Sequence, residues 1–119
     1  MRGRKAPKTR GGQRRRLLSK ARLRQMIEEA TVDAYGESEQ IGGFHAAIDE
    51  HLAVPFKTTL LGMPVTVSGV DLTDRDEIVA FCMRGRLRQA IPILDLVLPS
   101  PAPTGAEWIE AYRHWVRGG

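Results

Sequence analysis

The hydrophobic residues change their spacing near residue 53, and this change restricts the possible folds more than any other feature of the sequence. Before this point they recur at helical intervals in two segments, 17–34 and 39–52, the second with Ile41, Phe44, Ile48 and Leu52. Beyond Pro55 they are often β-branched and form four short runs, 56–61, 65–70, 78–83 and 87–98. We therefore predict two helices followed by four or five short strands, with Ser38 as the N-cap of the second helix.

The connections between the predicted strands are short, which favours antiparallel pairing into a strongly curved sheet or a small SH3-like barrel. After the proline-rich segment 99–103, Thr104 and Glu107 have the spacing of a capping box and predict a last helix. Its aromatic residues, Trp108, Tyr112 and Trp115, share one face that we expect to belong to the core. The predicted fold class is α+β, with two N-terminal helices, a small antiparallel curved sheet or SH3-like barrel, and a C-terminal helix.

The charge of the chain is divided between two unlike parts. Residues 1–24 hold eleven Lys/Arg and no Asp or Glu, whereas residues 25–119 hold seven Lys/Arg against fourteen Asp/Glu, a net charge of −7. Residues 1–24 are therefore predicted to form a basic arm that runs into the first helix, and residues 25–119 a single acidic domain. Because the start of the arm has almost no apolar side chains to bury, we expect it to be disordered when unbound.

A basic arm of this kind can neutralise phosphates and release their counterions. One prediction is therefore that residues 1–24 attach the protein to nucleic acid or to another acidic partner. The arm has no aromatic residue to stack on bases, so this binding would have little sequence selectivity. The alternative is a solvated tail without a partner, and the composition favours neither.

Several classes of protein are disfavoured by what the sequence lacks. No run of 18 apolar residues and no secretory apolar segment is present, so we predict no membrane span and a cytoplasmic location. The single cysteine, Cys82, excludes an intrachain disulfide and lies in an apolar strand, which predicts a buried structural thiol. The three histidines do not have zinc-ligand spacing, and neither a nucleophile–histidine–acid set nor a phosphate-binding glycine loop is present. We therefore predict that the protein is not an enzyme.

Two acidic clusters are the strongest candidates for chemistry. The first comprises Asp33, Glu37 and Glu39, with Asp49 in the following helix; the second, between two predicted strands, comprises Asp71, Asp74, Asp76 and Glu77. Ca²⁺ takes about six to eight oxygen ligands, which the carboxylates and carbonyls of flexible loops can supply. The second cluster is not an EF-hand, because Thr73 and Arg75 occupy the alternate ligand positions and the turn glycine is missing. Spacing alone leaves a solvated acidic surface as the alternative.

The first acidic cluster lies in a string that has a counterpart in a known family. The stretch Val32–Gln40, with sequence VDAYGESEQ, followed by Gly43, Phe44 and Val54–Phe56, resembles the cyanobacterial-type calcium-binding protein family. The agreement covers residues 26–117, and the string around Asp33 is its specific part. The resemblance implies a small α+β protein that binds Ca²⁺ through surface carboxylates without an EF-hand.

Residue by residue, the resemblance makes ligands of Asp33, Glu37, Glu39 and Asp49, and it places Asp71, Asp74, Asp76 and Glu77 in the family's acidic loop. The function that we predict is that of a Ca²⁺ buffer or low-affinity sensor. The alternative is a non-catalytic interaction module whose basic arm binds nucleic acid or an acidic partner.

Overall fold

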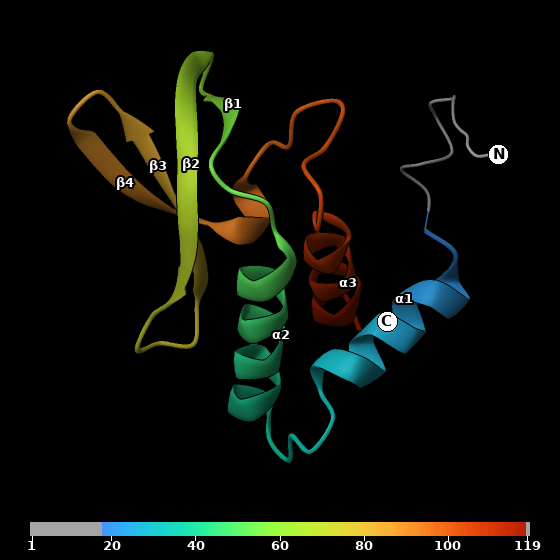
Figure 1. Cartoon of the computed structure of the whole chain (residues 1–119). Helices are drawn as coiled ribbons and strands as arrows, with labels where there is room; N and C mark the ends of the chain where they lie inside the picture. Colours follow the sequence, from blue (N-terminus) through green and yellow to red (C-terminus); the bar gives the residue numbers. More distant parts are fainter. Residues whose placement is uncertain (1–17, 119) are drawn as a thin grey trace, which may run out of the picture.

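The computed structural model describes residues 18–118 and has the predicted α+β fold (Figure 1). Its elements, in chain order, are α1 (Lys20–Ala30), α2 (Glu37–His51), β1 (Phe56–Leu60), β2 (Met63–Leu72), β3 (Ile78–Arg84), β4 (Leu87–Pro92), the short 3₁₀ helix η2 (Ile93–Asp95) and α3 (Glu107–Val116). The predicted disorder of the basic arm falls on residues 1–17, outside the described part. No helix of the described part is long and apolar enough to cross a membrane.

The two N-terminal helices are shorter or differently capped than the sequence predicts. Helix α1 begins at the N-cap Ser19, whose hydroxyl accepts a hydrogen bond from the Arg22 amide at 3.0 Å. It ends at Ala30 rather than at residue 34, and the Thr31 hydroxyl donates to the Ile27 carbonyl at 2.7 Å. The N-cap of α2 is Gly36, so the prediction of Ser38 at this position is wrong.

The four strands form an antiparallel sheet in the order β1-β2-β3-β4. In the described part of the chain the sheet is open, so it is the curved-sheet form of the prediction rather than a closed barrel. The predicted last strand, 87–98, ends at Pro92, where the chain turns into η2. Because the sheet is a simple meander, the β1–β2 and β3–β4 turns lie at one end and the β2–β3 turn at the other (Figure 1).

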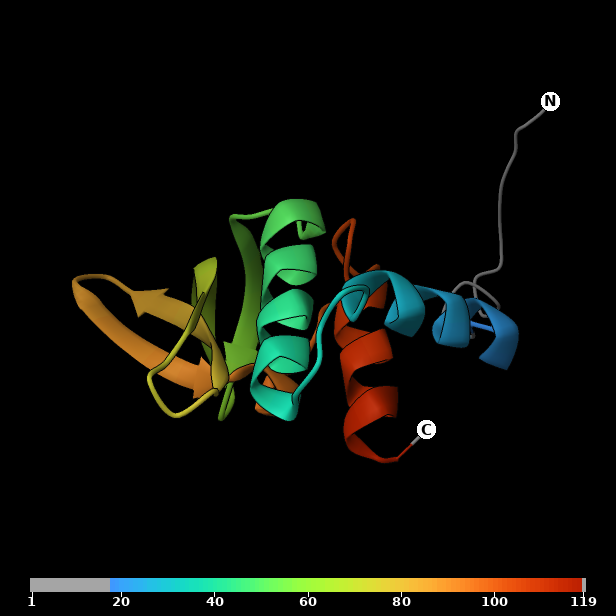
Figure 2. The ribbon, with the colours of Figure 1, turned by 90° about the horizontal axis from the view of Figure 1, so that it is seen from below.

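All three helices lie on one face of the sheet, with α2 nearest to it, α3 behind α2 and α1 on the outside (Figure 2). Between these layers is the core, whose largest fully buried side chains are Met26, Phe44, Ile48, Val67, Ile78, Ile93 and Ile109. The Phe44 ring lies 5.3 Å from the ring of Tyr112 and 5.2 Å from that of Trp115, in tilted geometries that favour aromatic pairs. The predicted core face of α3 is confirmed, with Trp115 at its half-buried edge.

Helix α3 starts without the capping box that the sequence predicts. Its N-cap is Ala106, and no side chain caps it. Thr104 instead uses its backbone carbonyl to accept a hydrogen bond from the Ala53 amide at 2.8 Å. The neighbouring Gly105 has φ of 89° and lies directly against the His51 carbonyl, where no side chain fits. Contact with the end of α2, not a local capping sequence, therefore sets the start of α3.

Candidate functional site

The structure brings both acidic clusters to the same end of the molecule. The α1–α2 loop, the first turn of α2 and the β2–β3 turn all lie at the lower end of Figure 1, and in Figure 2 the first turn of α2 stands between the other two segments. We call this region the acidic end; its carboxylates are those of Asp33, Glu37, Glu39, Asp71, Asp74, Asp76 and Glu77. All of these residues are exposed except Asp76, which is half-buried.

The first half of the acidic end is the loop before α2 and the first turn of that helix. Asp33 has φ of 62°, a left-handed conformation that aspartate tolerates better than most residues. One carboxylate oxygen of Glu39 accepts a hydrogen bond from the Tyr35 amide at 2.8 Å, which ties the helix to the preceding loop. Glu37 and Glu39 lie in the first turn, where the helix dipole favours negative charge. The hydrogen bond and the helix dipole therefore order this loop and first turn without a cation.

The second half of the acidic end is the β2–β3 turn, which is organised by Thr73. Its amide donates to the Glu77 carbonyl at 2.9 Å, and its hydroxyl accepts from the Glu77 and Arg75 amides at 3.1 and 3.3 Å. Asp76 has φ of 61°, and its amide donates to the Thr73 carbonyl at 3.0 Å. Because backbone groups and a threonine hydroxyl close this turn, its shape does not depend on the carboxylates of Asp74, Asp76 and Glu77.

Tyr112 links the two halves electrostatically. This residue of α3 is 8% exposed. Burial raises the pKa of its phenol above the usual range, and the negative charges of Glu77 and Glu37 raise the pKa further. One carboxylate from each half of the acidic end thus raises the pKa of the same phenol.

Asp49 lies apart from the other predicted ligands. It follows Glu37 by twelve residues in the same helix, which corresponds to roughly 18 Å along the axis. Within residues 18–118, no three His, Cys, Asp or Glu side chains gather closely enough to hold a metal ion. The acidic end therefore supplies many carboxylates on two loops, but in residues 18–118 they do not form a preformed metal site.

Two other side chains with reactive groups, Cys82 and His51, are held in packing contacts. Cys82 is buried in β3, as predicted, and burial raises the pKa of its thiol, so the unreactive protonated form is favoured near neutral pH. The imidazole of His51 stacks on Trp108, with ring centroids 5.2 Å apart and an interplanar angle of 11°. These contacts give both residues a packing role.

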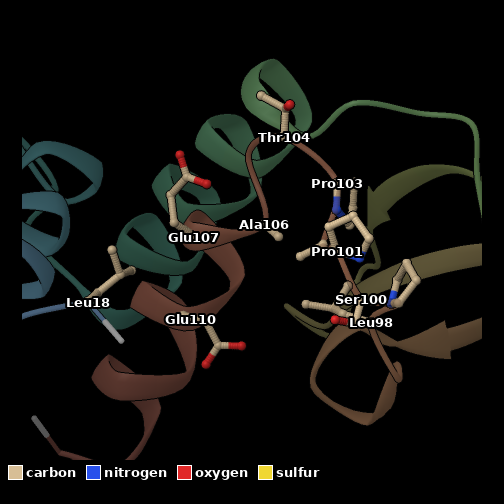
Figure 3. A pocket seen from close by; sticks show the side chains of 11 residues that line it. Leu18, Leu98, Ser100, Pro101, Pro103, Thr104, Ala106, Glu107 and Glu110 are labelled. Carbon is tan, nitrogen blue, oxygen red and sulfur yellow. The ribbon is translucent and has the colours of Figure 1, made fainter. Parts of the chain in front are cut away.

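A groove of about 590 Å³, which was not predicted from the sequence, lies between the proline-rich segment and α3 (Figure 3). Its walls include Pro99, Pro101 and Pro103, while Glu107 and Glu110 lie along the helix. Glu110 is already paired, because Arg113 donates to it at 3.3 Å. The alternating prolines were the available signal, but a proline-rich connection forms a groove only when a helix packs beside it.

Comparisons of the chain with protein-family models, with curated proteins and with solved structures find no match. The α+β fold therefore rests on the structure alone, and the resemblance to the cyanobacterial-type calcium-binding family stays a prediction.

Proposed function

We propose that the protein binds Ca²⁺ at the acidic end and acts as a non-catalytic calcium buffer or low-affinity sensor. The observation that carries the proposal is that two acidic segments distant in the sequence, 33–39 and 71–77, lie at the same end of the molecule (Figure 1). Both are on connecting loops or at element ends, where side chains reorient at little cost to the core.

The exposed, separated arrangement of the carboxylates leads us to expect a modest affinity for Ca²⁺. Ca²⁺ accepts irregular arrangements of six to eight oxygens, roughly 2.3–2.6 Å away, so ligands from two loops suit it better than they suit Mg²⁺. The acidic end holds seven carboxylates, and their mutual repulsion is relieved when a divalent cation binds. Drawing exposed side chains together costs conformational entropy, however, and this cost lowers the affinity.

Calorimetric titration of the full chain with Ca²⁺ tests the proposal. The variant Glu37→Gln/Glu77→Gln removes one charge from each half of the acidic end, and we expect it to weaken binding severalfold. Asp49→Asn is the matched control, because it removes a charge from the same helix far from the acidic end. Bound Ca²⁺ should also raise the free energy of unfolding, by about 2.7 kcal/mol at a hundred times Kd. Absence of both heat and stabilisation at millimolar Ca²⁺ would refute the proposal.

A second candidate function, attachment to nucleic acid or an acidic partner, is supported by the charge of the N-terminal region. Three of the eleven basic residues of segment 1–24, Lys20, Arg22 and Arg24, lie in the described part, on the exposed surface of α1. Binding of duplex DNA should fall steeply with salt and should be lost when the basic residues before Leu18 are replaced by glutamine. Ca²⁺ binding should survive that replacement, so the two functions are separable.

A further inference from the structure

The two hairpin turns opposite the acidic end form a second surface with a distinct chemistry. The β1–β2 turn is Leu61-Gly62, and the β3–β4 turn is Gly85-Arg86. Both turns lie at the upper end of the sheet in Figure 1. The Arg84 guanidinium donates to the Pro64 carbonyl at 3.2 Å and so joins one hairpin to the other. We call these two turns, together with the adjoining strand residues Arg84, Leu87 and Arg88, the hairpin tips.

Leu61 is an unexpected residue at its position. It has φ of 52°, followed by Gly62 at 77°, and a two-residue turn of this kind favours Asn, Asp or Gly at both positions. A left-handed conformation costs a residue with a Cβ on the order of 1–2 kcal/mol. The Leu61 side chain is 97% exposed, so burial within the molecule does not offset this strain. Strain without an internal benefit is a sign of a functional position.

Apolar surface continues from Leu61 onto the face of the sheet that the helices cover further down. Between the hairpin tips this face is open and forms a shallow cleft of about 220 Å³. Its apolar lining consists of Leu60, Leu61, Met63, Val65, Cys82 and Leu87. Leu87, in the second hairpin, is 73% exposed. The hairpin tips therefore present two neighbouring leucines to the outside.

The charge around these leucines is entirely positive. Segments 56–67 and 84–92 contain Lys57, Arg84, Arg86 and Arg88 and no acidic residue. The Arg88 guanidinium lies 4.3 Å above the Phe81 ring, which holds it beside the sheet. The β2–β3 turn at the opposite end carries Asp71, Asp74, Asp76 and Glu77. The sheet is thus electrostatically polar, and its own charges favour an orientation with the hairpin tips toward an anionic surface.

We propose that the hairpin tips dock on an anionic membrane surface. Leu61 and Leu87 enter the boundary between headgroups and acyl chains, while Arg84, Arg86 and Arg88 contact lipid phosphates. An anionic membrane fits this surface because it offers phosphates to the arginines and, directly beneath them, an apolar layer to the protruding leucines. Nucleic acid offers the anions but no apolar layer for Leu61, and the cleft is too small to receive a helix of a partner protein.

Sedimentation of the full chain with vesicles of phosphatidylcholine and phosphatidylserine tests this proposal. In Leu61→Asn/Leu87→Gln, asparagine suits the turn better than leucine, so the variant should melt no lower than the wild type. Its vesicle affinity should nevertheless fall about tenfold, or ~1.4 kcal/mol. Val32→Gln is the control, because Val32 is also exposed but lies beside the acidic end. Vesicles of phosphatidylcholine alone should bind the wild type much more weakly.

The basic arm is the competing cause of vesicle binding, and salt distinguishes it. Attraction by the arm is screened at high salt, whereas the effect of the two leucines should persist there. Equal vesicle binding by the wild type and the double variant would overturn the proposal and assign the attachment to the arm. Equal binding to neutral and anionic vesicles would also overturn it. A loss of duplex DNA binding in the double variant would assign the hairpin tips to nucleic acid instead.

Discussion

Two adjacent glycines in α2 provide a sharp test of how the helices pack. A Cβ at Gly43 would overlap the Ala30 carbonyl oxygen and stand 3.0 Å from the carbonyl carbon. At Gly42 a Cβ would meet nothing within 4 Å. Replacing glycine with alanine inside a helix should by itself stabilise the protein by about 1 kcal/mol at either position. The two substitutions therefore share the same helix-propensity term and differ only in the contact with α1.

For Gly43→Ala the contact should outweigh the gain in helix propensity. The overlapping atom belongs to the backbone of α1 and cannot rotate away, so the helices must separate. Overpacking of this kind costs typically about 1–3 kcal/mol, and the depth of the overlap points to the upper end. We therefore expect Gly42→Ala to be stabilised by about 1 kcal/mol and Gly43→Ala to be about 2–3 kcal/mol less stable than Gly42→Ala.

Thermal and urea unfolding followed by circular dichroism measure this difference. For a domain of this size, 1 kcal/mol corresponds to about 4–8 °C in Tm, so the two variants should melt at least about 8 °C apart. Equal stability of the two variants would refute the close packing of α1 on α2. Because this contact holds the loop that carries Asp33, Gly43→Ala should also weaken Ca²⁺ binding, if the acidic end is the calcium site.

Three further predictions follow from individual contacts. Glu37→Gln/Glu77→Gln should lower the pKa of Tyr112, because both carboxylates oppose the phenolate; absorbance titration in a Tyr35→Phe background measures it, and Asp49→Asn should leave it unchanged. Gly105→Ala should destabilise the protein by more than about 2 kcal/mol in urea unfolding, since the new Cβ would overlap the His51 carbonyl, whereas Gly85→Ala adds only backbone strain and should cost less. Cys82 should react with a disulfide reagent far more slowly in the folded protein than in urea, because its thiol is buried and its pKa is raised; similar rates would contradict its burial.

The fold class could be predicted because it depends on local periodicity. The stripe from Ile41 to Leu52 faces the sheet as one side of α2, and the β-branched runs pair in the order in which they occur. The short connections predicted antiparallel pairing, and the structure confirms it. The buried face of α3, including Trp108 and Tyr112, was evident for the same reason.

The element ends were less predictable, because contacts between distant residues set them. Ser38 has a suitable side chain for an N-cap, yet the chain enters α2 at Gly36, where Glu39 reaches back to the Tyr35 amide. Thr104 and Glu107 match a capping box, but the 104–106 turn is instead held against the end of α2. In both places a local capping signal is present in the sequence, but a different contact sets the start of the helix.

The sequence by itself determined the types of the elements, their order and the carboxylates available for a cation, because these depend on residue type and short-range spacing. Only the tertiary structure decided that segments 33–39 and 71–77 share one end, that Asp49 lies outside it, and that Leu61 and Leu87 stand together among arginines. Such juxtapositions arise when the apolar faces of helices and sheet are buried together. That packing determines which distant loops lie at the same end of the molecule. Short-range spacing in the sequence does not predict this arrangement.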